Sequence, residues 1–160
     1  MEPMLLQSAR LSVTIRREYA RVKKDQSAKF YTYVLQLQEG KFYVGNTDNI
    51  YTRLLDHTLM TPSSSLWVKH YGPVERVVEV ARNSGKHDEH YKTLQYMTMF
   101  GWDNVRGSSY CKVQMFNPPE ALKTFSRTRE GEFEYLSREE IDGVLDAIEE
   151  LKHLEATPAG

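Results

Sequence analysis

Polar and apolar side chains begin to alternate at residue 30, in the segment FYTYVLQLQ that spans residues 30–38. A period of two, with many aromatic and β-branched residues, is typical of a β-strand. Glu39-Gly40 is a turn signal, and KFYVG at 41–45 continues the alternation, so the pair predicts a β-hairpin. The valine-rich segment VERVVEVA at 74–81 predicts a third strand that is buried on both faces.

Segments in which apolar residues recur at helical spacing lie between and after these strands. Thr47 or Asp48 is a candidate N-cap for a helix whose apolar stripe includes Ile50 and Leu54. A second helix is expected from about His87 to Phe100, and Gly101 provides a stop signal.

A capping box, Ser137-Arg-Glu-Glu140, predicts the start of a last helix near residue 137. Its apolar stripe consists of Ile141, Val144, Leu145, Ile148 and Leu151. A stripe of this width indicates that the helix docks on the rest of the chain.

The order β, β, α, β, α predicts an α/β (α+β) fold, in which helices flank a small, mainly antiparallel sheet of three strands. We expect helical extensions at both ends of this unit. The chain is accordingly divided into a basic N-terminal extension (1–29), a central domain (30–117), a linker (118–136) and an acidic C-terminal helix (137–155).

Composition narrows the class of protein. The chain has 160 residues and one cysteine, Cys111, which excludes an intramolecular disulfide framework and a cysteine-rich zinc site and fits a reducing compartment. No apolar run approaches ~20 residues, so no membrane partner is expected. We expect an intracellular protein, in the cytoplasm or the nucleus, with an organelle left open.

Charge is segregated along the chain although the overall net charge is only -1. Residues 1–30 carry a net charge of +4, whereas residues 120–160 carry -6. The basic end, including Arg16 and Arg17, is a candidate arm for binding DNA. The alternative is an amphipathic helix that packs on the domain through Leu11, Ile15 and Tyr19.

Five side chains form a coherent set for attack on a phosphodiester. Tyr33 and Tyr43 lie on the two strands of the hairpin, Arg53 and His57 share one face of the next helix, and Glu89 lies at the start of the second helix. A phenol can orient or deprotonate water, a guanidinium can bind phosphate oxygens, and a carboxylate can hold a hard divalent cation.

At these residues the chain resembles the GIY-YIG nuclease family. Thr32-Tyr33 matches the end of the first motif, and Tyr43-Val44-Gly45 matches the second. The family arginine falls on Arg53, the histidine one turn later on His57, the glutamate on Glu89 and the terminal asparagine on Asn104. The similarity covers roughly residues 30–105.

The resemblance implies a DNA endonuclease that hydrolyses phosphodiester bonds with a single metal ion. Tyr43 would act as general base or orient the water, and Tyr33 would hydrogen-bond the nucleophile or the scissile phosphate. Glu89, or its neighbour Asp88, would be the sole protein ligand of Mg²⁺ or Mn²⁺. His57 would support Tyr43 or touch phosphate, its alternative role being to complement the helix dipole.

Two departures from the family pattern concern Tyr31, which replaces the glycine of the first motif, and Asn46, which replaces the base after the second. Lys69, Asn46 and Asn104 are further candidate contacts to DNA, in addition to Arg16 and Arg17. Two single residues are given structural roles: Trp67 is expected in the core and Arg106 as a surface cation.

The competing hypothesis is a catalytically silent module of the same fold, which binds DNA or another protein. In either case the acidic C-terminal helix is a possible surface for a protein partner.

Overall fold

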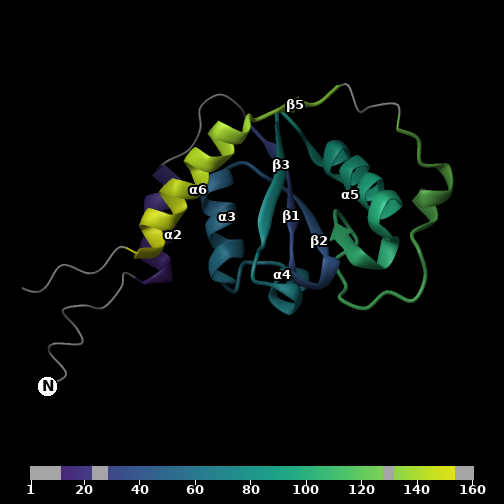
Figure 1. Ribbon diagram of the computed structural model, residues 1–160, viewed down its shortest axis with the longest axis horizontal. Helices are drawn as coiled ribbons and strands as arrows, with labels where there is room; N and C mark the ends of the chain where they lie inside the picture. Colours follow the sequence, from purple (N-terminus) through teal and green to yellow (C-terminus); the bar gives the residue numbers. More distant parts are fainter. Residues whose placement is uncertain (1–11, 23–28, 128–131, 154–160) are drawn as a thin grey trace, which may run out of the picture.

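The computed structural model describes residues 12–22, 29–127 and 132–153, and these ranges form one mixed sheet with helices on both faces (Figure 1). The sheet has five strands in the order β4-β2-β1-β3-β5, and all pairs are antiparallel except the parallel pair β2–β4. The strands are β1 (Tyr31–Gln36), β2 (Phe42–Thr47), β3 (Arg76–Arg82), β4 (Val105–Gly107) and β5 (Glu134–Tyr135).

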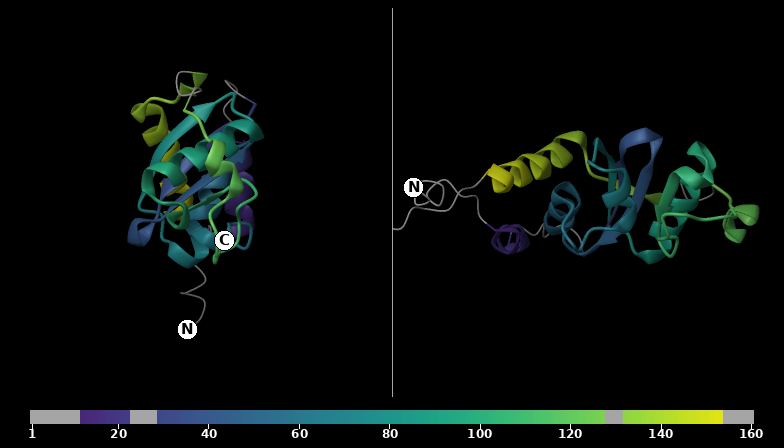
Figure 2. Two further views of the ribbon diagram at one scale, coloured as in Figure 1. Left: turned by 90° about the vertical axis from the view of Figure 1, so that its right-hand side faces the viewer. Right: turned by 90° about the horizontal axis from the view of Figure 1, so that it is seen from below.

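Five α-helices lie within the described ranges. They are α2 (Val13–Val22), α3 (Ile50–Leu59), α4 (Leu66–Tyr71), α5 (Lys86–Phe100) and α6 (Arg138–His153). Figure 1 and Figure 2 show α5 on one side of the sheet and α3 and α6 on the other, with α2 beyond them. None of these helices is long and apolar enough to cross a membrane.

The predicted α/β character and the hairpin are confirmed, but the sheet has five strands and not three. The hairpin turn is a short 3-10 segment in which Glu39 and Gly40 have φ of 58° and 70°. The strands that the pattern missed, β4 and β5, have three and two residues, which is too short for a period of two to be visible. Segment 118–136, predicted as a linker, contains β5 and a 3-10 turn at Glu120–Thr124.

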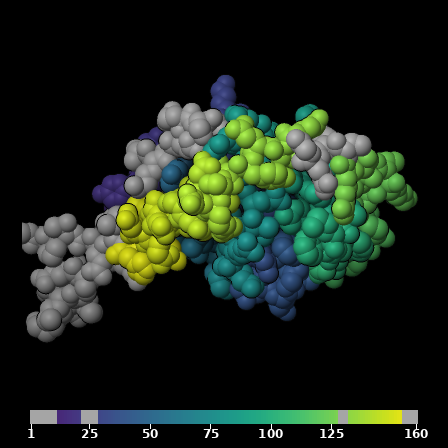
Figure 3. Space-filling model, turned by 45° about the horizontal axis from the view of Figure 1, so that its top comes forward, coloured from purple at the N-terminus to yellow at the C-terminus, as the bar shows by residue number. Residues whose placement is uncertain are grey.

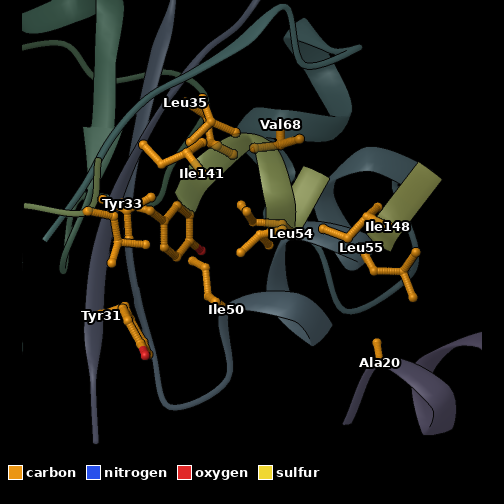
Figure 4. Packing of buried hydrophobic residues seen from close by; sticks show 14 of the residues in the cluster. Ala20, Tyr31, Tyr33, Leu35, Ile50, Leu54, Leu55, Val68, Ile141 and Ile148 are labelled. Atoms are coloured by element: carbon orange, nitrogen blue, oxygen red, sulfur yellow. The ribbon is translucent and has the colours of Figure 1, made fainter. Parts of the chain in front are cut away.

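Each face of the sheet has its own apolar core. Tyr33 and Leu35 of β1 point towards α3, where they pack with Leu54 and with Ile148 of α6 (Figure 4). On the opposite face Val34 and its neighbours on β2 pack against α5. Trp67 of α4 is buried, as predicted, and its Nε1 donates to the carbonyl of Phe42.

Specific capping residues determine where the helices α3 and α6 begin. Asn49 caps α3, in place of the predicted Thr47 or Asp48, because its side-chain oxygen accepts the amides of Tyr51 and Thr52. The predicted capping box of α6 is present between Ser137 and Glu140. The short helix α4 was not predicted from the sequence.

The two end helices pack on α3 and on each other. The predicted contact face of α2 was wrong: Ile15 and Tyr19 are exposed, whereas Arg16 and Ala20 face inward, and Leu11 lies outside the described residues. Helix α6 runs along the surface beside α2 (Figure 3) and buries its predicted stripe, with Leu145 partly exposed. The basic helix α2 and the acidic helix α6 are therefore neighbours in space.

Candidate functional site

The site is built on the hairpin, where Tyr33 of β1 lies directly opposite Gly45 of β2. The Tyr33 ring covers Gly45 so closely that a Cβ at residue 45 would lie 2.2 Å from the Tyr33 hydroxyl oxygen. Glycine is therefore needed at position 45 to let the aromatic side chain lie flat across the strand. This contact fixes the position of the buried phenol.

One helical turn of α3 supplies two partners for Tyr33. Arg53 Nε donates to the Tyr33 hydroxyl at 3.3 Å, and that hydroxyl lies 2.7 Å from His57 Nε2. His57 Nδ1 in turn lies 2.7 Å from Ser64 Oγ. A buried chain of hydrogen bonds thus runs from Arg53 through Tyr33 and His57 to the loop after α3.

Burial determines the protonation states of Tyr33 and His57 in this hydrogen-bond chain. It lowers the pKa of His57 to about 3, and the charge of Arg53 acts in the same direction. Burial also raises the pKa of Tyr33 well above its usual value, assisted by Tyr43 and opposed by Arg53. At neutral pH both groups are therefore uncharged, and one hydrogen bond joins the phenol to Nε2 while another joins Nδ1 to the Ser64 hydroxyl.

Full burial also keeps Tyr33 and His57 from contacting a substrate. Tyr33 and His57 are both 0 % exposed, so neither reaches a phosphate without a movement of the chain. The contact with nucleophile or phosphate expected for Tyr33 is not available in this conformation. Both side chains instead position their neighbours.

Tyr43 is the partly exposed member of the aromatic group. Its ring centroid lies 6.3 Å from that of Tyr33 and 5.2 Å, edge to face, from that of His57. Burial raises the pKa of Tyr43, an effect opposed by Arg53 and reinforced by Glu89. The phenol is consequently a hydrogen-bond donor at neutral pH.

Arg53 connects the phenols to the surrounding loops. Burial alone would lower the pKa of Arg53, but the oxygens of Tyr33 and Tyr43 raise it, so the guanidinium remains charged. Its Nη1 donates to the carbonyl of Ser63 at 2.6 Å and lies 3.8 Å from Asp56 Oδ2. About a quarter of the side chain, 26 %, stays exposed.

Glu89 reaches the same group from the first turn of α5. Burial raises the pKa of its carboxyl, while the amide of Ser108 and the charges of Lys86 and Arg53 oppose the shift. The neighbouring Asp88 accepts the amide of Gly85 at 2.9 Å and so caps α5. Glu89, one of the two predicted ligands, interacts electrostatically with both phenols and with Arg53.

The described residues contain no group of three or more His, Cys, Asp or Glu that could hold a metal. One carboxylate fits Mg²⁺ or Mn²⁺ only in a site where water and substrate phosphate supply the remaining oxygen ligands. Glu89 is partly buried, and its carboxyl feels the charge of the arginine that would hold such a phosphate. The residues present are compatible with that single-carboxylate arrangement.

The five candidate DNA contacts are scattered. Asn46 turns its amide inward, to the carbonyls of Tyr31 and Ser84, and Asn104 closes the far end of α5 by hydrogen bonds to Lys41 and Phe100. Exposed Lys69 donates to Pro62, in the loop that also binds Arg53.

The two arginine candidates lie on α2. Arg16 is only 7 % exposed, and Arg17 forms a bidentate ion pair with Asp56, at 2.7 Å and 3.2 Å. Neither side chain belongs to a free basic arm.

The sequence analysis did not identify the roles of three polar residues, Asp56, Ser64 and Arg106. Asp56 is buried and interacts with Arg17, Arg53 and Thr61, while Ser64 is the last member of the hydrogen-bond chain. Arg106, predicted as a surface cation, is 0 % exposed, stacks over Trp67 at 4.3 Å and donates to the carbonyls of the following loop. Cys111 is a free, exposed thiol.

Comparisons with protein-family models, with curated proteins and with solved structures give no match to this chain.

Proposed function

We propose that the protein is a metal-dependent DNA endonuclease of the GIY-YIG type. The observation that carries the proposal is the electrostatic interaction of Arg53 with Tyr43 and with Glu89, side chains of three different elements, beside the hydrogen-bonded pair Tyr33 and His57. A phenol, a charged guanidinium and a carboxylate are groups that can together catalyse phosphodiester hydrolysis.

Each side chain has a separate task in this reaction. The exposed part of Arg53 binds the oxygens of the scissile phosphate, because a guanidinium matches phosphate geometry. Tyr33 and His57 hold Arg53 and the Tyr43 ring in position. Tyr43 orients the attacking water, since burial keeps its hydroxyl protonated at neutral pH.

Glu89 is the residue that would hold the divalent cation. Mg²⁺ or Mn²⁺ bound there would neutralise the charge that builds up on the phosphate and lower the pKa of bound water. The raised pKa of Glu89 implies that its affinity for a cation falls as the pH is lowered, because the protonated carboxyl is a poor ligand.

The test is the conversion of supercoiled plasmid to nicked circles by the purified protein, with Mn²⁺ or with EDTA. We expect nicking only with the metal, and we expect Tyr43→Phe to slow it by about a hundredfold, the effect of losing one group that positions a proton. Tyr19→Phe, on the exposed side of α2, is the matched control and retains the full rate. Equal rates for the two variants would remove Tyr43 from the reaction.

A second candidate is a DNA-binding module of the same fold without catalysis. It is favoured by one observation, the inward position of Asn46 at the place of a basic residue in the family pattern. This candidate predicts salt-sensitive DNA binding but no metal-dependent nicking.

A further inference from the structure

A cleft opens between α2 and the first turns of α3, and Arg53 forms the wall that it shares with the candidate site. Its volume of about 450 Å³ lies in the range of cavities that hold small ligands. Helix α2 contributes Arg17 and Arg21 to the lining, and the segment after β2 contributes Thr47 and Asp48.

We propose that this cleft binds the DNA backbone next to the scissile phosphodiester, with Arg21 as the contact to the flanking phosphate. The inference rests on the proposed function, because it says where the DNA strand whose phosphate binds Arg53 continues along the protein. It assigns to the N-terminal helix a role in binding substrate.

The site and the cleft lie along the same strand. Tyr43 and Thr47 share one face of β2, and between them the buried Tyr33 ring covers Gly45. Four residues of a strand span roughly 13 Å, so a ligand that begins at Tyr43 and passes Arg53 reaches the cleft at Thr47.

Charge in the cleft favours an anion. Three arginines face two carboxylates, and one of these, Asp56, is 2 % exposed and already paired with Arg17. Arg17 uses Nε and Nη2 on Asp56 and remains 40 % exposed, whereas Arg21 is 66 % exposed. The most exposed cations are thus the two arginines of α2, whereas Arg53 is 26 % exposed. They are opposed by Asp48 on the lining and by Glu18, which pairs with Arg21.

Donors from α3 are of less use to a phosphate. The amides of Tyr51 and Thr52 are already taken by the Asn49 side chain. The Thr52 hydroxyl, also on the lining, has no hydrogen-bond partner among the described residues. We therefore expect substitution of Arg21 to lower the affinity for DNA more than substitution of the donors on α3.

The experiment measures the affinity for a fluorescein-labelled DNA duplex by fluorescence anisotropy, in EDTA and at 50–200 mM KCl. Arg21→Gln should reduce the slope of log K against log salt by about 0.9 and weaken binding at 0.1 M salt about eightfold, the effect of one lost phosphate contact. Lys123→Gln is the matched control, because Lys123 is similarly exposed and paired with a glutamate three residues away, and it should bind as the wild type does. In Figure 1 its segment lies at the opposite end of the molecule from α2.

Wild-type affinity and slope for Arg21→Gln would overturn the cleft proposal even if the protein cleaves DNA. A loss specific to Arg21→Gln in a protein that never nicks plasmid would keep the cleft and refute the nuclease. A wild-type chain with no affinity for the duplex would contradict both.

Discussion

The contact between Tyr33 and Gly45 determines the geometry of the site at the scale of single residues. Any side chain at position 45 would push against the phenol that holds Arg53 and His57. Glycine at position 45 therefore has a steric reason in this chain, independent of any chemistry.

Gly45→Ala should lower the free energy of unfolding by about 1–3 kcal/mol, the usual cost of an extra methyl group in a packed region. Gly143→Ala is the control, because a Cβ at residue 143 of α6 meets no atom within 4 Å. That variant should gain roughly 0.5–1 kcal/mol from helix propensity. Urea denaturation measures both, and equal stability of the two variants would contradict the contact.

His57 makes stability depend on pH. The folded chain keeps the imidazole neutral down to about pH 3, whereas the unfolded chain binds a proton near the ordinary pKa of 6.5. Between these values the unfolded state holds more protons, so the contribution is complete above about pH 6.5 and is lost as the pH falls.

From pH 7 to pH 4.5 the wild type should lose about 3 kcal/mol more than His57→Gln, in which this proton is absent. The carboxyl groups titrate in both chains, so the difference in urea midpoints isolates the histidine. Parallel losses in the two chains would show that His57 is not buried in its neutral form.

At the scale of elements, the ion pair of Arg17 with Asp56 joins α2 to α3. Arg17→Gln should destabilise the protein by about 1–2 kcal/mol, because a buried carboxylate loses its closest cation. Arg21→Gln, which breaks only an exposed pair with Glu18, should cost less than about 0.5 kcal/mol. The Tm of each variant is measured by thermal unfolding. An equal shift in Tm for the two variants would contradict a stabilising role of the Arg17–Asp56 ion pair.

Elements with long, regular patterns could be predicted from the sequence. The hairpin, α3, α5 and α6 could be predicted from the period of their apolar residues, although the cap of α3 was misplaced, and they carry all five candidate catalytic residues. The short strands β4 and β5 could not be predicted, since their pairing depends on neighbours distant in the chain, and α4 has only six residues, too few for a helical period to be visible. Arg106 shows the same limit, because only the fold brings Trp67 under its guanidinium.

The direction in which a polar side chain points was equally hidden. Arg16 and Asn46 carry the chemistry expected of DNA contacts, yet tertiary packing turns both inward. Composition identifies which groups are available, whereas burial decides which of them a ligand can reach.

At the scale of the whole molecule, the acidic helix α6 packs on α2 and α3, on the same side of the sheet as Arg53. The exposed acids of that helix would repel a phosphate backbone, so a DNA strand bound at Arg53 and in the α2 cleft would have to run clear of α6. The acidic helix stays a candidate surface for a protein partner.

The most direct test of the central claim is the single-turnover rate of DNA cleavage in Mg²⁺ by Glu89→Gln, with DNA affinity measured in parallel. The account predicts a rate at least about a hundredfold below that of the wild type, the scale on which one lost electrostatic contact slows a reaction, with affinity unchanged. Asp88→Asn, which keeps an acceptor for the Gly85 amide, is the control and should cleave at the wild-type rate. Equal cleavage by Glu89→Gln and the wild type would contradict the account.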